Sequence, residues 1–169
     1  MKTLSPEKQK LLNIFQQHVD AELRKDIDTT LATMSPDPHI NSIPTIIGGI
    51  GLDAVWHFYR TLILSGKFFP PNTEMIPVSR TIDEKQLVDE IIFKFTHTIE
   101  IGWMLPNIAP TGKRVEIPLV VIVGFSDDKI THEHIYWDQA SVLVQIGLLD
   151  PTGLPIKGVE TAKKMDELR

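Results

Sequence analysis

The stretch KITHEHIYWD, residues 129–138, holds the densest group of titratable side chains in the chain. Its pattern is typical of a β-strand, in which alternate residues point to the same face. On such a strand His132, His134, Tyr136 and Asp138 lie on one side of a sheet. Several titratable groups on one face of an otherwise apolar sheet predict a pocket for a small molecule.

The neighbouring strands decide which residues lie opposite this stretch. Residues 127–128, both Asp, predict a two-residue hairpin turn, which would place His134 opposite Val121. If the preceding pair of strands aligns odd positions with odd positions, His97 joins the same side, near Tyr136. The loop that joins that pair is too long for the sequence to fix this register.

The rest of the chain predicts helices first and long strands afterwards. Ser5 caps a helix that starts at Pro6 and carries apolar residues every four positions, with His18 and Asp20 expected on its solvated face. Asp28 is expected to cap a second, short helix. The expected elements are helices from Pro6, over 29–34, over 52–64 and after Asp138, at best an edge strand within 39–47, and strands over 75–82, 87–102, 114–125 and 130–137. This order predicts an α+β fold in which helices cover one face of an antiparallel sheet.

Length and composition exclude several classes of protein. The 169 residues fit one domain, expected over 1–150, with a C-terminal tail over 151–169. The chain has no cysteine, which excludes a disulfide scaffold, a thiolate zinc site and a cysteine nucleophile. Its net charge of −5 argues against a nucleic-acid partner, and no apolar segment is long enough for a membrane span. A cytoplasmic location is therefore expected.

Plainer interpretations of the same residues stay open. A single buried histidine or tyrosine is more often a core residue, and Asp138 stands where it could simply cap the following helix. His134 and Asp138 are about 13 Å apart at about 3.3 Å per strand residue, so they cannot form a direct acid–base pair. His132-x-His134 followed by an acid is similar to the first metal-binding motif of the cupins. The second cupin motif has no match, so no metal is expected.

Residues 129–138 also resemble the last strand of the SnoaL-like branch of the NTF2-like superfamily. The usual form there is a turn, then Lys-Ile, then Glu-His-x-x-Tyr-Trp-Asp. The resemblance extends to the order of elements over nearly the whole chain, and residues 139–162 are similar to a stand-alone subgroup. It implies a curved sheet wrapped as a cone around helices, an apolar pocket, and a homodimer formed through the outer face of the sheet.

The resemblance implies a chemistry as well. In polyketide cyclases of this branch, the aspartate that matches Asp138 acts as an acid–base group, aided by other polar side chains. His97 and His134 are the candidates for that help here. The residues expected to contact a substrate are Tyr136, Asn41 and Tyr59.

Two functions from different classes remain. The first is a cofactor-independent enzyme of the cyclase, isomerase or dehydratase (lyase) type that acts on a small apolar carbonyl compound. The second is a non-catalytic domain that binds a small molecule or another protein through the same pocket or the outer sheet face. Neither function calls for a cofactor or a metal.

Overall fold

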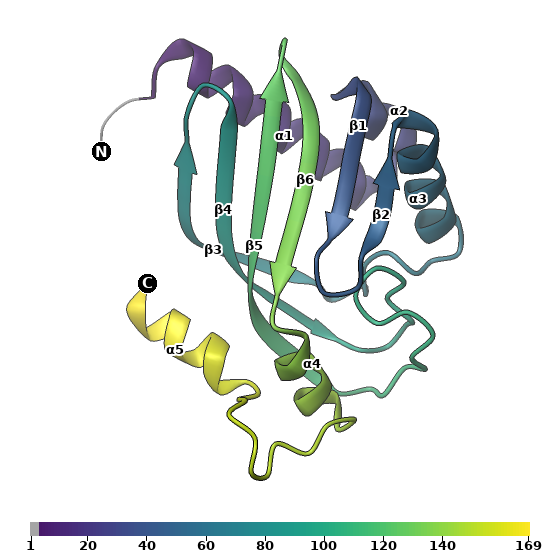
Figure 1. Cartoon of the computed structure of the whole chain (residues 1–169), viewed down its shortest axis with the longest axis vertical. Coiled ribbons are helices and arrows are strands. Elements are labelled where there is room, and N and C mark those ends of the chain that lie inside the picture. The colour runs from purple at the N-terminus through teal and green to yellow at the C-terminus, as the bar shows by residue number, and fades with distance from the viewer. Residues whose placement is uncertain (1–3) are drawn as a thin grey trace.

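Helix α1 (Pro6–Arg24) begins at the predicted cap, where the Ser5 side chain accepts a hydrogen bond from the Lys8 amide. In the computed structural model, which describes residues 4–169, this helix crosses behind a curved six-stranded sheet (Figure 1). Leu11 and Phe15 of its apolar stripe are buried in the core. The predicted α+β class, with helices covering the sheet, is therefore confirmed.

The other elements follow the predicted order, with differences at their ends. Asp26, and not Asp28, caps α2 by accepting a hydrogen bond from the Thr29 amide. Strand β4 ends at Thr96 and not near 102, and the loop that follows buries Trp103. The bounds are α2 (Ile27–Ala32), β1 (Met34–Ser42), β2 (Ile47–Ile50), α3 (Leu52–Leu64), β3 (Glu74–Ile82), β4 (Gln86–Thr96), β5 (Arg114–Ser126), β6 (Lys129–Trp137), α4 (Gln139–Ile146) and α5 (Glu160–Leu168). The predicted domain range 1–150 starts with residues 1–3, which lie outside the described residues.

The strand order of the sheet is β2-β1-β6-β5-β4-β3. All neighbours are antiparallel except β1 and β6, which run parallel. The prediction that residues 39–47 form at best an edge strand is wrong, because β1 is hydrogen-bonded on both sides. Pro44, which motivated that prediction, falls in the turn after β1, where its missing amide proton removes no ladder hydrogen bond.

The C-terminal residues form a helix that packs on the sheet. Helix α5 contacts β5 and β4, and its Ala162 is buried. The Ser141 hydroxyl of α4 donates a hydrogen bond to the Gly158 carbonyl, which ties the segment before α5 to the body of the protein. Within residues 4–169, no helix is both long enough and apolar enough to cross a membrane.

The β5–β6 hairpin has the predicted turn followed by an irregularity. Asp127 and Asp128 both have positive φ, 50° and 59°, as a tight two-residue hairpin turn requires. Phe125 pairs with Ile130, but the next pair is Gly124 with His132. One residue of β6 between these pairs has no partner, which is the definition of a β-bulge.

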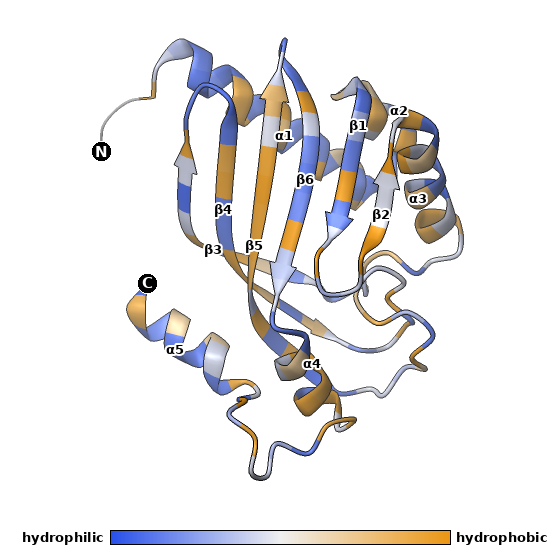
Figure 2. Ribbon diagram, viewed as in Figure 1, coloured by the Kyte–Doolittle hydropathy of each residue, from blue (hydrophilic) through white to orange (hydrophobic). Residues whose placement is uncertain are grey.

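This bulge reverses the two faces of β6. His134 lies opposite Ile122 and not opposite Val121, so the predicted register is wrong by one residue. Because side chains alternate along a strand, a shift of one residue turns every side chain to the other face. Glu133 and Ile135 therefore face the helices, whereas His134 faces outward. Hydrophilic residues line much of β6 beside the largely hydrophobic β5 (Figure 2).

Candidate functional site

A cavity of about 260 Å³ lies between α1, α3 and the inner face of the sheet. Its wall is mainly apolar and aromatic, as in pockets that bind small apolar molecules. Arg80 and Asp89 also line it, but they neutralise each other through two hydrogen bonds of 3.0 and 2.5 Å. The lining residues that carry other polar side chains are Gln16, Asp20, Glu22, Tyr59 and Glu133.

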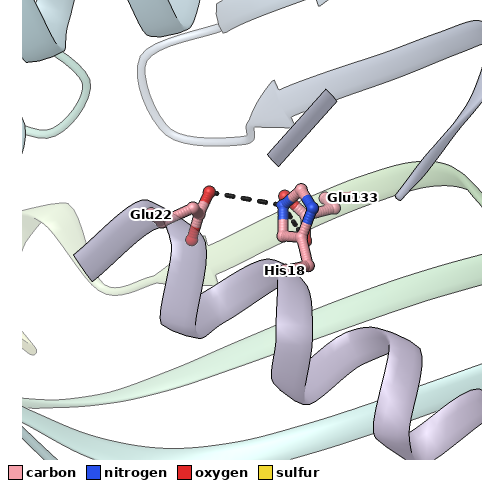
Figure 3. A group of neighbouring side chains, drawn as sticks. All are labelled: His18, Glu22 and Glu133. Atoms are coloured by element: carbon pink, nitrogen blue, oxygen red, sulfur yellow. Dashed lines mark ion pairs between the residues drawn. The ribbon is translucent and has the colours of Figure 1, made fainter. Parts of the chain in front are cut away.

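The polar part of the wall belongs to a buried cluster of four side chains. His18 and Glu22 come from α1 and Glu133 comes from β6 (Figure 3), and Tyr59 comes from α3. His18 Nε2 lies 3.4 Å from Glu22 Oε1 and 3.5 Å from Glu133 Oε1. The Tyr59 hydroxyl donates a hydrogen bond of 2.7 Å to Glu22 and lies 3.1 Å from His18 Nε2.

The hydrogen bonds of Thr33 determine where His18 carries a proton. The Thr33 hydroxyl donates to the Thr30 carbonyl at 2.6 Å, so it can only accept from His18 Nδ1, which lies 2.7 Å away. His18 Nδ1 therefore bears a hydrogen. With Nε2 facing two carboxylates, the ring is an imidazolium whose two N–H groups both have acceptors.

Electrostatics support this protonation state. Burial by itself would lower the pKa of His18, but the carboxylates of Glu133 and Glu22 outweigh burial and raise that pKa to about 10. Burial raises the pKa of Glu22, against the opposing effect of His18. The pKa of Tyr59 is raised well above its usual value by burial and by the two carboxylates. Glu22 is therefore a partly exposed carboxyl group at the cavity wall that takes up a proton more readily than usual.

The same cluster offers ligand atoms for a metal. One atom each from His18, Glu22 and Glu133 lies within 4.8 Å of the others. A metal would have to displace the proton of an imidazolium whose pKa is about 10. The residues therefore fit an acid–base cluster better than a metal site.

Of the six residues predicted to form the site, Tyr59 lines the cavity and the other five do not. His132, His134 and Tyr136 share a face as predicted, but it is the outer face, because the bulge reverses β6. Tyr136 is 40% exposed there. Asn41 of β1 pairs with His134 on the same outer face.

Asp138 and His97 lie apart from this group. Asp138 caps α4, with its side chain accepting a hydrogen bond of 3.1 Å from the Ser141 amide. The β4–β5 register does align odd positions with odd positions, which places His97 beyond β4 on the inner side and not on the side of Tyr136. There His97 Nδ1 lies 3.1 Å from the Thr111 hydroxyl, and burial lowers the pKa of His97.

Three of the four residues of the cluster, His18, Glu22 and Glu133, were not predicted from the sequence. The expectation that His18 is solvated is wrong, because its side chain is fully buried, whereas Asp20 is exposed as expected. A signal was present: His18 and Glu22 continue the buried stripe of Leu11 and Phe15 at helical spacing. Glu133 had no such signal, because its direction depends on the bulge.

Comparisons with known proteins identify the fold. No protein-family model matches the sequence, and no curated protein is similar to it. A candidate SnoaL-like polyketide cyclase from Jannaschia sp. CCS1 superposes with a TM-score of 0.69 at 16% identity, covering 89% of this chain and 100% of that one. An NTF2-like protein of unknown function from Burkholderia pseudomallei K96243 gives a TM-score of 0.61 at 15% identity, covering 82% and 98%.

Enzymes with known reactions share this architecture. An LEH-like epoxide hydrolase from M. tuberculosis superposes with a TM-score of 0.57 at 16% identity, covering 79% of this chain and 86% of that one. The structural neighbours also include an epoxide hydrolase/cyclase-like enzyme that takes part in pyran ring formation. At sequence identities this low, structural similarity establishes the fold and nothing more. The fold implied by the resemblance of residues 129–138 is confirmed. The chain has the SnoaL-like, NTF2-like cone fold.

Proposed function

We propose that this protein is a cofactor-independent acid–base enzyme of the isomerase or cyclase type, acting on a small apolar carbonyl compound in the cavity. The observation that carries the proposal is the cluster of Glu22, Tyr59, Glu133 and His18 on an otherwise apolar wall. The cavity volume of about 260 Å³ is near the lower end for ligand pockets, which favours a small substrate.

Each member of the cluster has a distinct task in this proposal. Glu22 removes a proton from the carbon next to the carbonyl and returns it to another carbon of the same molecule, so the reaction needs no cofactor. Tyr59, whose single hydroxyl hydrogen is donated to Glu22 in the structure, gives that hydrogen bond to the substrate oxygen on which negative charge develops once the substrate is bound. His18, held between Glu22 and Glu133, keeps the buried carboxylates stable by supplying a fixed positive charge.

One observation favours a non-catalytic alternative. The titratable groups of the cluster are hydrogen-bonded to one another, which is also how a purely structural network or a binding pocket satisfies buried polar groups. In that case the cavity binds a small molecule without converting it. A protein with the same fold, TerC, was co-crystallised with polyporic acid, so this architecture accommodates small organic molecules.

Deuterium exchange distinguishes the two functions without knowledge of the natural substrate. The protein is incubated in D₂O with a panel of small cyclic ketones and enones, 2-cyclohexenone among them, and loss of the proton next to the carbonyl is followed by NMR. The wild type is expected to accelerate the exchange, and Glu22→Gln should slow it by about 100-fold or more. Asp20→Asn, an exposed carboxylate at the same cavity, is the matched control.

The outcome decides between the functions. Equal exchange rates for the wild type and Glu22→Gln would remove Glu22 from the mechanism. Saturable binding of panel compounds with no acceleration of exchange would favour the binding domain.

The proposal also includes a homodimer formed through the outer face of the sheet. Val120 and Ile122 of β5 are only half-buried on that face, and Tyr136 of β6 is exposed beside them. Apolar side chains on both faces of one strand require cover on both faces. A cytoplasmic location stays a prediction from the sequence.

A further inference from the structure

Three histidines gather on the outer face of the sheet, on the opposite side from the cavity. His132 and His134 come from β6, and His39 comes from the parallel neighbour β1, where it pairs with His132. The rings of His39 and His132 are stacked with centroids 5.0 Å apart. The ring of His134 is 5.1 Å from His39 and 4.7 Å from His132. We call these three residues the outer histidine cluster.

Two nitrogen atoms of this cluster are as close as ligands of one ion. His39 Nε2 and His134 Nε2 are 3.0 Å apart, joined by a hydrogen bond in which one ring N–H donates to the lone pair of the other ring, and an ion would replace that hydrogen. At metal–nitrogen distances of about 2.0–2.1 Å, that separation corresponds to an N–metal–N angle of about 95°. Such an angle is compatible with Zn²⁺ and with the neighbouring first-row ions that imidazole ligands favour.

From this geometry we propose that the outer histidine cluster binds a divalent transition-metal ion such as Zn²⁺, with His39 and His134 as the ligand pair and the His132 ring stacked beside them. The site is separate from the acid–base cluster and does not depend on the proposed enzymatic function. The His132-x-His134 motif alone could not predict this site. His39 is 93 positions before His132, and only the β1–β6 pairing brings the two residues together.

Neutral groups contact the nitrogens of the cluster: His132 Nδ1 lies 3.2 Å from the Thr131 hydroxyl, and His39 Nε2 and His134 Nε2 contact each other. Among residues 4–169, no carboxylate forms an ion pair with any of the three histidines. In the single chain the three side chains are half-buried and open to solvent; in the proposed dimer, which uses the same sheet face, they would lie at the interface. An ion held by two ring nitrogens keeps open positions, which water can fill.

The absence of a side chain at Gly124 leaves the space that the His132 ring occupies. His132 is its partner in the β5–β6 register, and a Cβ added at Gly124 would lie 2.1 Å from His132 Cε1. The ring thus occupies the space that any other side chain at this position would fill. Replacing Gly124 by alanine must displace the ring from its stack with His39.

Titration calorimetry with ZnCl₂ on protein free of any polyhistidine tag tests the proposal. The wild type should bind one Zn²⁺ per chain and show no heat of binding with MgCl₂, because Mg²⁺ prefers oxygen ligands. His39→Ala and His134→Ala should each weaken Zn²⁺ binding by about tenfold or more. Gly124→Ala should weaken it less. His57→Ala is the matched control, because His57 is an exposed histidine on α3.

NMR of the histidine rings in the wild-type protein tests the same site without relying on the correct folding of any variant. Two-dimensional ¹H–¹⁵N spectra of the six histidines should show Zn²⁺-induced shifts at His39 and His134, and no shift at His18 or His57. Three results would overturn the proposal: no saturable Zn²⁺ binding, wild-type Zn²⁺ affinity in both His39→Ala and His134→Ala, or ring shifts confined to His18. The last result would place the ion in the acid–base cluster instead.

Discussion

Replacing Glu133 by glutamine removes one of the two carboxylates that hold His18 as a cation, while keeping nearly the same side-chain shape. His18 Nε2 lies 3.5 Å from Glu133 and 3.4 Å from Glu22. Glu133 makes the larger contribution to the raised pKa of His18, which is about 10. An opposite charge at such distances shifts a pKa by about 1–3 units, so the substitution should lower the pKa of His18 by about 2 units.

The change in pKa has a consequence for stability. A histidine whose pKa is raised on folding stabilises the folded state fully below its unfolded pKa, and this contribution is lost as the pH rises through the folded pKa. At about 1.4 kcal/mol per pH unit, His18 should cause the wild type to lose about 3 kcal/mol between about pH 7 and about pH 9.5. In Glu133→Gln the same loss should be only about 1.2 kcal/mol, because a His18 with the lower folded pKa has less stabilisation left to lose above pH 7.

Two measurements check this reasoning. Ring NMR gives the pKa of His18 directly, and urea unfolding at both pH values gives the free energies of unfolding. Glu90→Gln is the matched control, since Glu90 is a half-buried sheet carboxylate hydrogen-bonded to Ser79 and remote from His18. A wild-type His18 that titrates at its ordinary value, or the same pH dependence of unfolding in wild type and Glu133→Gln, would refute the argument.

Three further predictions concern other parts of the structure. Tyr59→Phe should slow the deuterium exchange by about 100-fold while ligand binding persists, and an unchanged exchange rate would show that the phenol is not the donor. Deletion of Thr131, which lies at the bulge between Ile130 and His132, should lower the free energy of unfolding by about 4 kcal/mol or more in urea, whereas Thr131→Ala should have little effect. Ile122→Lys should convert the proposed dimer to a monomer in sedimentation velocity at micromolar concentration, and a wild type that already sediments as a monomer would contradict the dimer.

Most of the fold could be predicted because its signals are local. The cap at Ser5, the helix over 52–64 and the turn at residues 127–128 each depend on a few neighbouring residues, and the structure has all of them. The place of β1 inside the sheet could not be predicted, because it depends on pairing with β6, which is distant in the sequence. The effect of Pro44 likewise depended on whether it fell in a strand or in a turn.

The candidate site could be predicted only in part. The sequence by itself determined that residues 130–137 form a strand and that His132 and His134 share one of its faces. Tertiary structure alone decided that the face with the histidines is the outer one and that Glu133 points inward to meet His18. The physical reason is the period of two along a strand: one unpaired residue at a bulge exchanges the faces, and nothing in the local pattern marks where that residue is inserted.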